Sequence, residues 1–196
     1  MDSTVEIRWH GRGGQGAKTA ALLFGEAALS LGKNIQAFPE YGPERMGAPV
    51  ASFNRISSEP ITLHCLITNP SIVVVLDPTL LVSVDVTAGL LEDGKIIVNT
   101  RQCPEDVRKQ LKLKAGKVFT VDASGISKAT IGREIPNTPM MGALAKVSAI
   151  LDFDLMLKDT EDKLKKKFAS KPEIIKGNME AIKRAYNEVI GECPDE

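Results

Sequence analysis

Six residues near the start of this chain have the types and spacing of a ligand-binding turn: Gly11, Arg12, Gly13, Gly14, Gln15 and Gly16, together called the glycine loop. They lie between a predicted strand and a predicted helix. Glycines allow a tight turn with positive φ and let the backbone approach a ligand, while free N–H groups at the helix start attract a phosphate or carboxylate. The sequence therefore predicts either an anion-binding loop or a simple tight turn.

The glycine loop fits the GxGxxG pattern of dinucleotide-binding folds, but a second feature of those folds is poorly matched. They place an acid at the end of the next strand, about 20 residues on, to hold the ribose hydroxyls. Here that strand ends in Ala37, Phe38 and Pro39, and Glu40 follows behind the proline in a glycine-rich loop. The sequence therefore disfavours NAD binding.

A phosphate-binding loop of the GxxxxGK[ST] type also fits in part, because the first and last glycines of the loop have the required spacing. Residues 72–77 likewise resemble the apolar strand and acid that hold magnesium in nucleotide triphosphatases. However, Ala17 is inserted before Lys18 and Thr19, and one residue turns a helix by about 100°. Both side chains would face away from the phosphates, so a free-standing nucleotide-binding module of the Rossmann or P-loop type is only the alternative function.

No other residues form a recognisable catalytic or metal-binding pattern. The chain has two histidines, His10 and His64, and three cysteines without a CxxC pair, Cys65, Cys103 and Cys193. Zinc and iron–sulfur ligands normally come in closer groups. We therefore expect no metal site and no catalytic residue in this chain, and reduced thiols as in a cytoplasmic protein.

Charge and hydropathy argue against two classes of partner. Lys plus Arg and Asp plus Glu both number 25, so no general electrostatic attraction to nucleic acid or to an anionic membrane is expected. No apolar run approaches the roughly 20 residues of a membrane span. The first residues lack the basic, apolar and small-residue pattern of a secretion signal, which again favours a cytoplasmic protein.

Short apolar runs alternate with helical patterns along the chain, which is typical of βαβ units. The expected fold is α/β, Rossmann-like, with a mostly parallel sheet flanked by helices and a C-terminal helical cap. We predict strands at residues 5–10, 35–38, 72–76, 95–99 and 117–121, an extended stretch at 50–56, helices at 17–31, 104–113 and 140–151, and two amphipathic C-terminal helices at 160–169 and 172–190.

The chain is assigned to a Rossmann-like domain at residues 1–156 and a C-terminal helical extension of the same domain at residues 157–196. Trp9 is expected in the core and His10 in a structural role. The cluster of Lys163, Lys165, Lys166 and Lys167 reads as a solvated helix face.

Two longer motifs resemble a known family. Residues 10–17, His-Gly-Arg-Gly-Gly-Gln-Gly-Ala, and residues 38–50, Phe-Pro-Glu-Tyr-Gly-Pro-Glu-Arg-Met-Gly-Ala-Pro-Val, are similar to the γ subunits of 2-oxoacid:ferredoxin oxidoreductases. The similarity continues through residues 55–57, 77–78 and 137–143, and so covers about the first three quarters of the chain. The Tyr-Gly-Pro-Glu block is the specific part, and residues 44–49 resemble the pyruvate-type version of the motif.

This resemblance implies the γ subunit of a pyruvate:ferredoxin oxidoreductase, or pyruvate synthase. Such an enzyme reversibly converts pyruvate and coenzyme A to acetyl-CoA and CO₂ while reducing ferredoxin. The resemblance also implies that thiamine diphosphate, Mg²⁺ and the 4Fe-4S clusters sit on other chains, so that this subunit binds no cofactor and is not catalytic alone. The implied partners are the thiamine-binding and iron–sulfur chains, with ferredoxin reached through the complex, in a hetero-oligomer.

Residues 38–50, called the contact loop, combine rigid prolines and glycines with apolar anchors and charges, which suits a docking surface. In the stronger form of this hypothesis the docking surface also helps to form the coenzyme A site. Arg12, Lys18 and Arg45 would then bind the phosphates of coenzyme A. In the weaker form it is a subunit interface only. The interface residues expected here are Tyr41, Gly42, Pro43, Glu44, Arg45 and Met46, joined by Asn137 and Thr138.

Asn137, Thr138 and Pro139 also have a second interpretation. They precede the helix predicted from Met140, and Asn is a common N-terminal cap whose side chain contributes about 1 kcal/mol. Of the two interpretations, the sequence favours the helix cap slightly over a place on the functional face.

Overall fold

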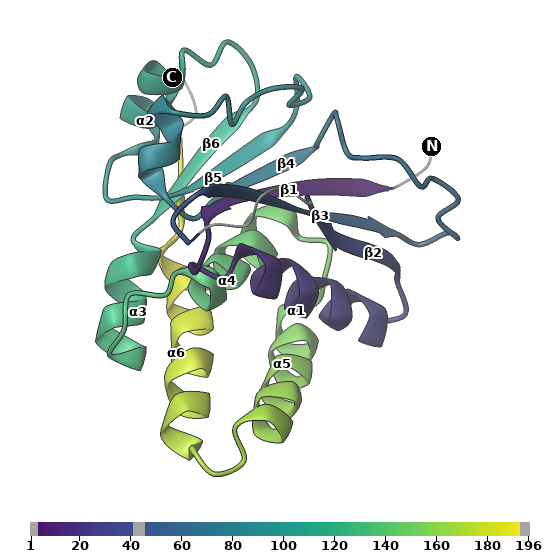
Figure 1. Ribbon diagram of the computed structural model, residues 1–196, viewed down its shortest axis with the longest axis vertical. Helices are drawn as coiled ribbons and strands as arrows, with labels where there is room; N and C mark the ends of the chain where they lie inside the picture. The colour runs from purple at the N-terminus through teal and green to yellow at the C-terminus, as the bar shows by residue number, and fades with distance from the viewer. Residues whose placement is uncertain (1–3, 41–45, 193–196) are drawn as a thin grey trace.

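The computed structural model describes residues 4–40 and 46–192. They form a central sheet with helices against one face and a smaller helix with irregular segments against the other (Figure 1). In chain order the elements are β1 (Val5–Arg12), α1 (Ala17–Ser30), β2 (Asn34–Pro39), β3 (Pro49–Ser57), β4 (Ile72–Val75), the short 3₁₀ helix η1 (Pro78–Val82), β5 (Lys95–Asn99), α2 (Pro104–Leu111), β6 (Lys117–Val121), α3 (Ala123–Ile131), α4 (Asn137–Ser148), α5 (Phe153–Lys167), α6 (Pro172–Glu188) and β7 (Ile190–Gly191).

The seven-stranded sheet is mixed, with the order β2-β3-β1-β4-β5-β6-β7. Its central strands β1, β4, β5 and β6 are parallel, whereas β3 pairs antiparallel with both β1 and β2, and β7 pairs antiparallel with β6. The prediction of a mostly parallel sheet is therefore wrong outside the centre. The connection from Pro39 to Pro49 is too short for the helical crossover that a parallel neighbour needs, so β3 returns antiparallel.

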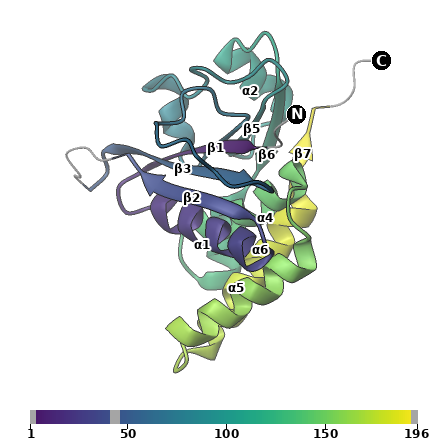
Figure 2. The same ribbon diagram turned by 90° about the vertical axis from the view of Figure 1, so that its right-hand side faces the viewer.

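The insertion of β3 also moves β2 away from β1. Both strands run in the same direction, but β3 lies between them, and β2 forms the edge of the sheet beside α1 (Figure 2). The carboxyl ends of β1, β2, β4, β5 and β6 and the amino end of β3 consequently meet along one edge of the sheet, which we call the carboxyl edge.

On the helix-covered face, side chains of β1 pack directly against α1. Trp9 is fully buried, as predicted, with its ring 6.3 Å from that of Phe24 in an edge-to-face arrangement. The Trp9 Nε1–H donates to Asn54 Oδ1 over 2.7 Å, so the indole is satisfied without water. The helix α1 ends close to its predicted limit because Gly32, with φ of 80°, closes a Schellman motif.

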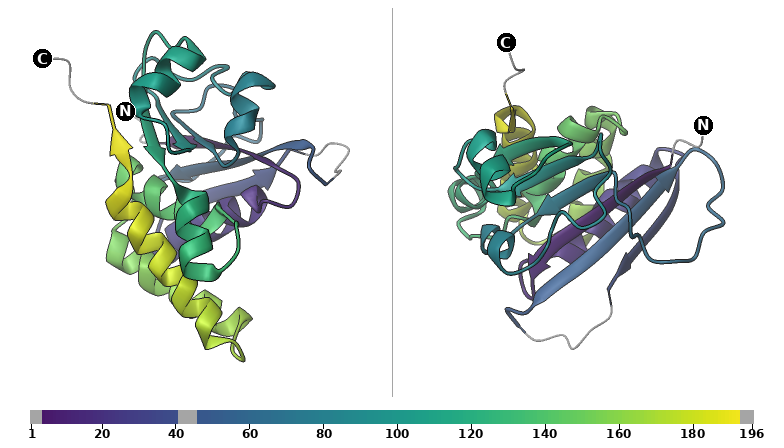
Figure 3. Two further views of the ribbon diagram at one scale, coloured as in Figure 1. Left: turned by 90° about the vertical axis from the view of Figure 1, so that its left-hand side faces the viewer. Right: turned by 90° about the horizontal axis from the view of Figure 1, so that it is seen from above.

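The helix α4 is the centre of this face, since nearly all of its residues are buried. Its Gly142 lies so close to α6 that a Cβ atom there would stand 2.1 Å from the carbonyl oxygen of Ile182. Buried apolar residues of α6, including Ala181 and Ala185, belong to the same hydrophobic cluster as Trp9. The C-terminal helices α5 and α6 pack together (Figure 3), and α6 is also part of the main core.

One helix begins earlier than the sequence predicts, and another was not predicted at all. The helix α5 begins at Phe153 rather than at residue 160, because the Asp152 carboxylate accepts a hydrogen bond from Leu155 N and caps it. The helix α3 was not predicted, and it is capped in the same way by Asp122 through Gly125 N. Of the predicted solvated lysine cluster, Lys165, Lys166 and Lys167 are exposed as expected, whereas Lys163 is half-buried and pairs with Asp159 and Glu26.

The opposite face of the sheet is covered in two ways: η1 and α2 pack on β4, β5 and β6 through a second apolar cluster, and irregular segments cover β1 and β3 and are held through buried arginines. Arg8 and His10, the neighbours of Trp9 in β1, point to this face, and the Arg8 guanidinium donates to the carbonyl oxygens of Val86 and Ala88 and to His10 Nε2. Burial, and then the charge of Arg8, lower the pKa of His10 to about 4. His10 is therefore neutral and structural at neutral pH.

Arg55 has the same role further along this face. Its side chain is fully buried, and it pairs with the Glu6 carboxylate over 2.7 Å while also donating to Gln36 Oε1. The same guanidinium donates to the carbonyl oxygens of Leu63 and Cys65 in the segment that connects β3 to β4. Carbonyl oxygens of a loop that forms no secondary structure of its own thus accept hydrogen bonds from a side chain of the sheet.

None of the described helices combines the length and the apolar character needed to cross a bilayer.

Candidate functional site

The glycine loop leads from β1 into α1 at the carboxyl edge of the sheet. Gly14 and Gly16 have φ angles of 98° and 85°, a backbone region in which side chains are strained, so glycine is required at both positions. Gly16 is the N-cap residue of α1 and supplies no side-chain hydrogen bond to the first turn. The first-turn N–H groups of α1 are therefore left for a ligand, a partner or water.

The loop is held in shape by the side chain of Gln15. Its Oε1 accepts from Arg12 N over 2.8 Å, and its Nε2 donates to the Asp77 carboxylate over 2.6 Å. A backbone bond from Gln15 N to the carbonyl oxygen of Arg12 closes the turn. Gln15 occupies a position that the GxGxxG pattern leaves open, yet here its side chain holds the loop in shape.

Asp77 is the residue on which these contacts converge. It also accepts hydrogen bonds from Thr79 N and Thr79 Oγ1, at 2.9 Å and 2.6 Å, and forms an ion pair with Arg12 over 3.3 Å. Burial alone would raise the pKa of Asp77, but the hydrogen bonds from Thr79 and Gln15 and the charge of Arg12 outweigh it and lower the pKa. The carboxylate is therefore ionised and neutralises much of the Arg12 charge.

From the sequence, Asp77 was interpreted only as the acid that ends a buried strand, and Thr79 was not identified as a site residue. A recognisable signal was present, because an Asp followed by Pro and Thr after a buried strand is typical of a cap for a short helical turn. Parallel strands also bring their carboxyl ends together, so residues that follow β4 are placed beside residues that follow β1.

The end of the contact loop is joined to the glycine loop by backbone hydrogen bonds. Gly13 N donates to the carbonyl oxygen of Ala48, and Gly47 N donates to the carbonyl oxygen of Gly13, over 2.9 Å and 3.0 Å. Arg12 adds a bond from its guanidinium to the carbonyl oxygen of Gly47. The Met46 side chain is 95% exposed next to this junction. The other predicted interface residues, Tyr41, Gly42, Pro43, Glu44 and Arg45, lie outside the described residues.

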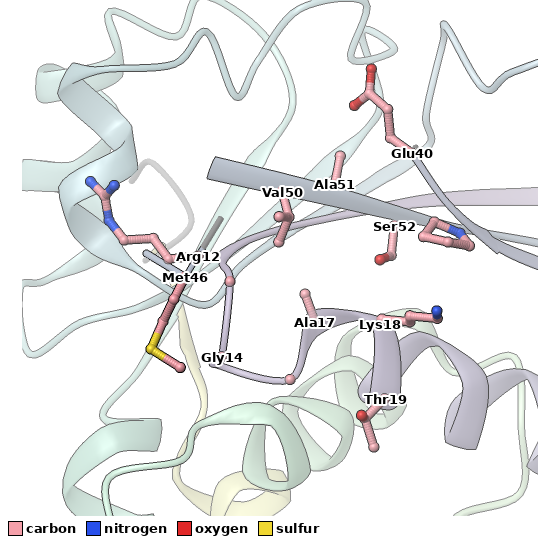
Figure 4. Close-up of a pocket in the computed structure, with 13 residues that line it drawn as sticks. Arg12, Gly14, Ala17, Lys18, Thr19, Glu40, Met46, Val50, Ala51 and Ser52 are labelled. Carbon is pink, nitrogen blue, oxygen red and sulfur yellow. The ribbon is translucent and has the colours of Figure 1, made fainter. Parts of the chain in front are cut away.

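An open pocket of about 500 Å³ lies between the glycine loop, the first turn of α1, the end of β2 and the start of β3. Arg12, Gly13, Gly14, Gly16 and Lys18 line it, together with Met46 from the contact loop. Figure 4 shows that Arg12 and Lys18 point toward opposite ends of this pocket. Of the predicted phosphate contacts in the glycine loop, Gly11 and Gln15 do not line the pocket and instead support the loop.

Asn137 and Thr138 are also brought to this region, but not as a helix cap. The helix α4 starts at Asn137 with Pro136 as its N-cap residue, so the predicted cap is wrong. The Asn137 side chain instead packs on Gly16, where an added Cβ would stand 2.6 Å from Asn137 Nδ2. Thr138 is buried and donates through its hydroxyl to Asn178 Oδ1 over 2.8 Å.

This geometry differs from both nucleotide-binding interpretations. In dinucleotide folds the strand after the first helix lies beside the first strand, whereas here β3 lies between β1 and β2. Glu40, which follows β2, lines the pocket from beyond β3 rather than from the neighbour of β1. Lys18 is exposed on the first turn of α1 and lines the pocket away from Arg12. Within residues 4–40 and 46–192, no three His, Cys, Asp or Glu side chains converge as metal ligands.

Comparisons with known proteins agree on one family. The family described as pyruvate ferredoxin/flavodoxin oxidoreductase matches residues 6–188 of this chain. The chain is 50% identical over 184 residues to the pyruvate synthase subunit PorC of Thermotoga maritima, covering 94% of each chain. It is 46% identical over 186 residues to the pyruvate/ketoisovalerate oxidoreductases common subunit gamma of Thermococcus litoralis, covering 95% of this chain and 97% of the relative.

Solved structures show the same fold. The crystal structure of pyruvate oxidoreductase subunit PORC from Thermotoga maritima matches with a TM-score of 0.83 and 46% identity, over 96% of this chain and 98% of that one. The 2-oxoglutarate:ferredoxin oxidoreductase of Magnetococcus marinus, solved with coenzyme A bound, matches with a TM-score of 0.74 and 18% identity, over 94% of this chain and 30% of that one. At this identity the second match supports the fold alone.

Proposed function

The chain belongs to the pyruvate ferredoxin/flavodoxin oxidoreductase family, and from that premise we propose that the glycine loop and the contact loop dock it onto its partner subunits and help to form the coenzyme A site. It is the γ subunit of a pyruvate:ferredoxin oxidoreductase complex, or pyruvate synthase. The reaction of that complex oxidises pyruvate with coenzyme A to acetyl-CoA and CO₂ and passes the electrons to ferredoxin.

The complexes of this family use thiamine diphosphate and iron–sulfur clusters. We propose that these groups are held by the partner chains and that this subunit provides binding surface rather than reacting groups. Its two described cysteines, Cys65 and Cys103, are both exposed free thiols. Free thiols persist in a reducing compartment, which supports a cytoplasmic location for the complex.

The observation that carries the docking part of the proposal is the exposed Met46 on a fixed backbone. An apolar side chain that is 95% exposed gains stability when a partner covers it, and a Met side chain adapts to the partner surface. The hydrogen bonds between Gly47, Ala48 and Gly13 hold the adjacent backbone in place before docking. A pre-ordered backbone loses less conformational entropy on association, which favours an interface at this position.

The coenzyme A part of the proposal rests on the pocket beside the glycine loop. Phosphate groups bind well at a helix N-terminus, and here the first turn of α1 has no side-chain cap. Arg12 is already paired with Asp77, whereas no carboxylate among the described residues lies within ion-pairing distance of Lys18. Lys18 is therefore the stronger candidate for a direct phosphate contact, with Arg45 as a further candidate outside the described residues.

Docking is tested by Met46→Asp in the reconstituted complex. A carboxylate at the centre of an apolar contact is costly to desolvate, so we expect the affinity for the partner subunits to fall at least about tenfold. Leu29→Asp is the matched control, because Leu29 is also exposed but lies at the far end of α1. Equal affinities of the two variants in a pull-down or in analytical ultracentrifugation would refute the docking surface.

The coenzyme A contact is tested separately with Lys18→Gln in the assembled complex. One lost charge-assisted contact should raise the apparent KM for coenzyme A by about tenfold and leave assembly unchanged. Lys114→Gln, an exposed lysine beyond the end of α2, is the control. If Lys18→Gln changes neither KM nor kcat, the surface is an interface only, and the same test can be applied to Arg45→Ala.

A further inference from the structure

A second cavity adjoins the pocket beside the glycine loop and lies between α1, the turn that joins α3 to α4, and the facing parts of α5 and α6. Its volume is about 370 Å³, which is within the range of small-molecule sites. Figure 1 shows these helices gathered below the sheet. Two of its lining residues, Thr19 and Asn137, lie beside the glycine loop, but the others come from parts of the chain that make no contact with that loop in the site described above.

The floor of the cavity is apolar and is built from four different parts of the chain. Leu23 of α1, Ile135 of the α3–α4 turn, Leu164 of α5 and Ile174 of α6 all line it, and Phe168 closes one end. Leu164 is buried, and the others are partly buried. This lining favours a ligand with an apolar body over a compact hydrophilic anion such as inorganic phosphate.

The charge of the lining has one sign. Arg133, Lys163 and Lys167 line the cavity, and no Asp or Glu side chain does so. Lys163 is already paired with Asp159 and Glu26. No carboxylate of the described residues lies within ion-pairing distance of Arg133 or Lys167, so these two cations remain available to a ligand.

Buried polar groups at the inner end of the cavity give it a defined orientation. Thr138 and Asn178 are 5% and 9% exposed and are joined by the hydrogen bond from the Thr138 hydroxyl to Asn178 Oδ1. Asn178 Nδ2 in turn donates to the carbonyl oxygen of Ile174. These hydrogen bonds fix the orientation of the Thr138 and Asn178 side chains beside the apolar part of the lining.

We propose that this cavity binds a small organic anion with an apolar body, such as a carboxylate with a hydrocarbon chain. The hydrocarbon part occupies the floor formed by Leu23, Ile135 and Leu164, and the carboxylate is held by Arg133 and Lys167 at the rim. Thr19 lines both this cavity and the coenzyme A pocket, and Asn137, which lines the cavity, rests on Gly16. A ligand bound here therefore contacts residues that also support the glycine loop.

The proposal is tested on the full-length chain with octanoate as the probe and isothermal titration calorimetry as the measurement. We expect saturable binding with one octanoate per chain. Octan-1-ol, which has the same apolar body without the charge, should bind at least about tenfold more weakly, because it lacks the charge-assisted contacts. Inorganic phosphate should not compete. Equal affinity for octanoate and octanol, or no saturable binding of octanoate, would overturn the proposal.

Variants locate the binding. Arg133→Gln with Lys167→Gln should weaken octanoate binding by at least about tenfold, whereas Lys166→Gln, an exposed neighbour that does not line the cavity, should leave it unchanged. Ile135→Trp should block binding by filling the cavity, and its melting temperature shows that the chain is folded. If the cavity instead receives a segment of a partner subunit, octanoate will bind the free chain but not the assembled complex, and the small-molecule proposal is then wrong.

Discussion

The two faces of the sheet are covered by different means. On one face, α1 and α4 pack apolar side chains against Ile7 and Trp9, and each helix satisfies its own backbone. On the other face, η1 and α2 pack apolar side chains over β4 to β6, but over β1 and β3 the side chains of Arg8 and Arg55 reach into irregular segments and donate to their carbonyl oxygens. A buried loop needs external hydrogen-bond donors that a helix does not need. This need for donors explains why the buried arginines of the described residues, Arg8 and Arg55, both lie on the loop-covered part of the sheet.

The largest expected effect tests the loop-covered face. Arg55→Leu removes the donor to two loop carbonyl oxygens and leaves Glu6 without its partner, so we expect the free energy of unfolding to fall by about 3 kcal/mol. Amide hydrogen exchange should increase in residues 58–71, because these residues lose their attachment to the sheet. The measurements are urea unfolding and hydrogen exchange by mass spectrometry.

Arg101→Leu is the control for that variant, because Arg101 also pairs with a carboxylate but its side chain is 81% exposed. Such surface pairs contribute roughly 0–1 kcal/mol. If both substitutions lower the free energy of unfolding by the same amount, buried arginines do not hold the loop-covered face. The two faces would then not differ in the way described above.

A second effect of intermediate size depends on pH and on His10. Its pKa falls from 6.5 to about 4 on folding, so the stabilising effect of the neutral ring is complete above pH 6.5 and is lost as the pH falls toward 4. By pH 5 the loss is about 2 kcal/mol. His10→Gln keeps an acceptor for Arg8 but does not titrate. The free energy of unfolding of the natural chain should therefore fall between pH 7 and pH 5 by about 2 kcal/mol more than that of the variant.

Identical pH dependences of the natural chain and His10→Gln in urea unfolding would show that His10 is not kept neutral by burial on this face.

The smallest effect tests the helix-covered face. In an open helix Gly142→Ala would stabilise the chain by about 1 kcal/mol, because alanine is the better helix former. Here the new Cβ would stand 2.1 Å from the carbonyl oxygen of Ile182, so α4 and α6 must separate. We expect a net loss of about 1 kcal/mol in the free energy of unfolding. A higher melting temperature for Gly142→Ala would show that the contact between α4 and α6 is looser than described.

The helix-covered face was the more predictable one from the sequence. The apolar periodicity of the sequence predicts most of its helices, including the limits of α1. Short runs of β-branched residues predict the strands around Val74 and Ile97. The insertion of β3 between β1 and β2 could not be predicted in this way, because strand order depends on contacts between distant residues. The helix α3 was missed because its short segment carries few large apolar residues.

The candidate site was predictable in part. The glycine loop and the contact loop were recognised as motifs, and the structure joins them through Gly13, Gly47 and Ala48. The role of Asp77 was not recognised, since an acid after a buried strand is common and its partners Arg12 and Gln15 come from a segment more than 60 residues away in the chain. The contact between Asn137 and Gly16 was likewise inaccessible to sequence reasoning, because it joins the starts of two helices far apart in the chain.

The junction between Gly13, Gly47 and Ala48 is made by main-chain atoms only. Its geometry therefore does not depend on which side chains the neighbouring positions carry, provided that glycine remains where φ is positive. Exchange of Met46 for another outward side chain would alter which surface the chain recognises without altering the path of its backbone. Related enzymes can in this way diverge in subunit pairing while they retain one scaffold, and chimeras that exchange this segment between relatives should fold.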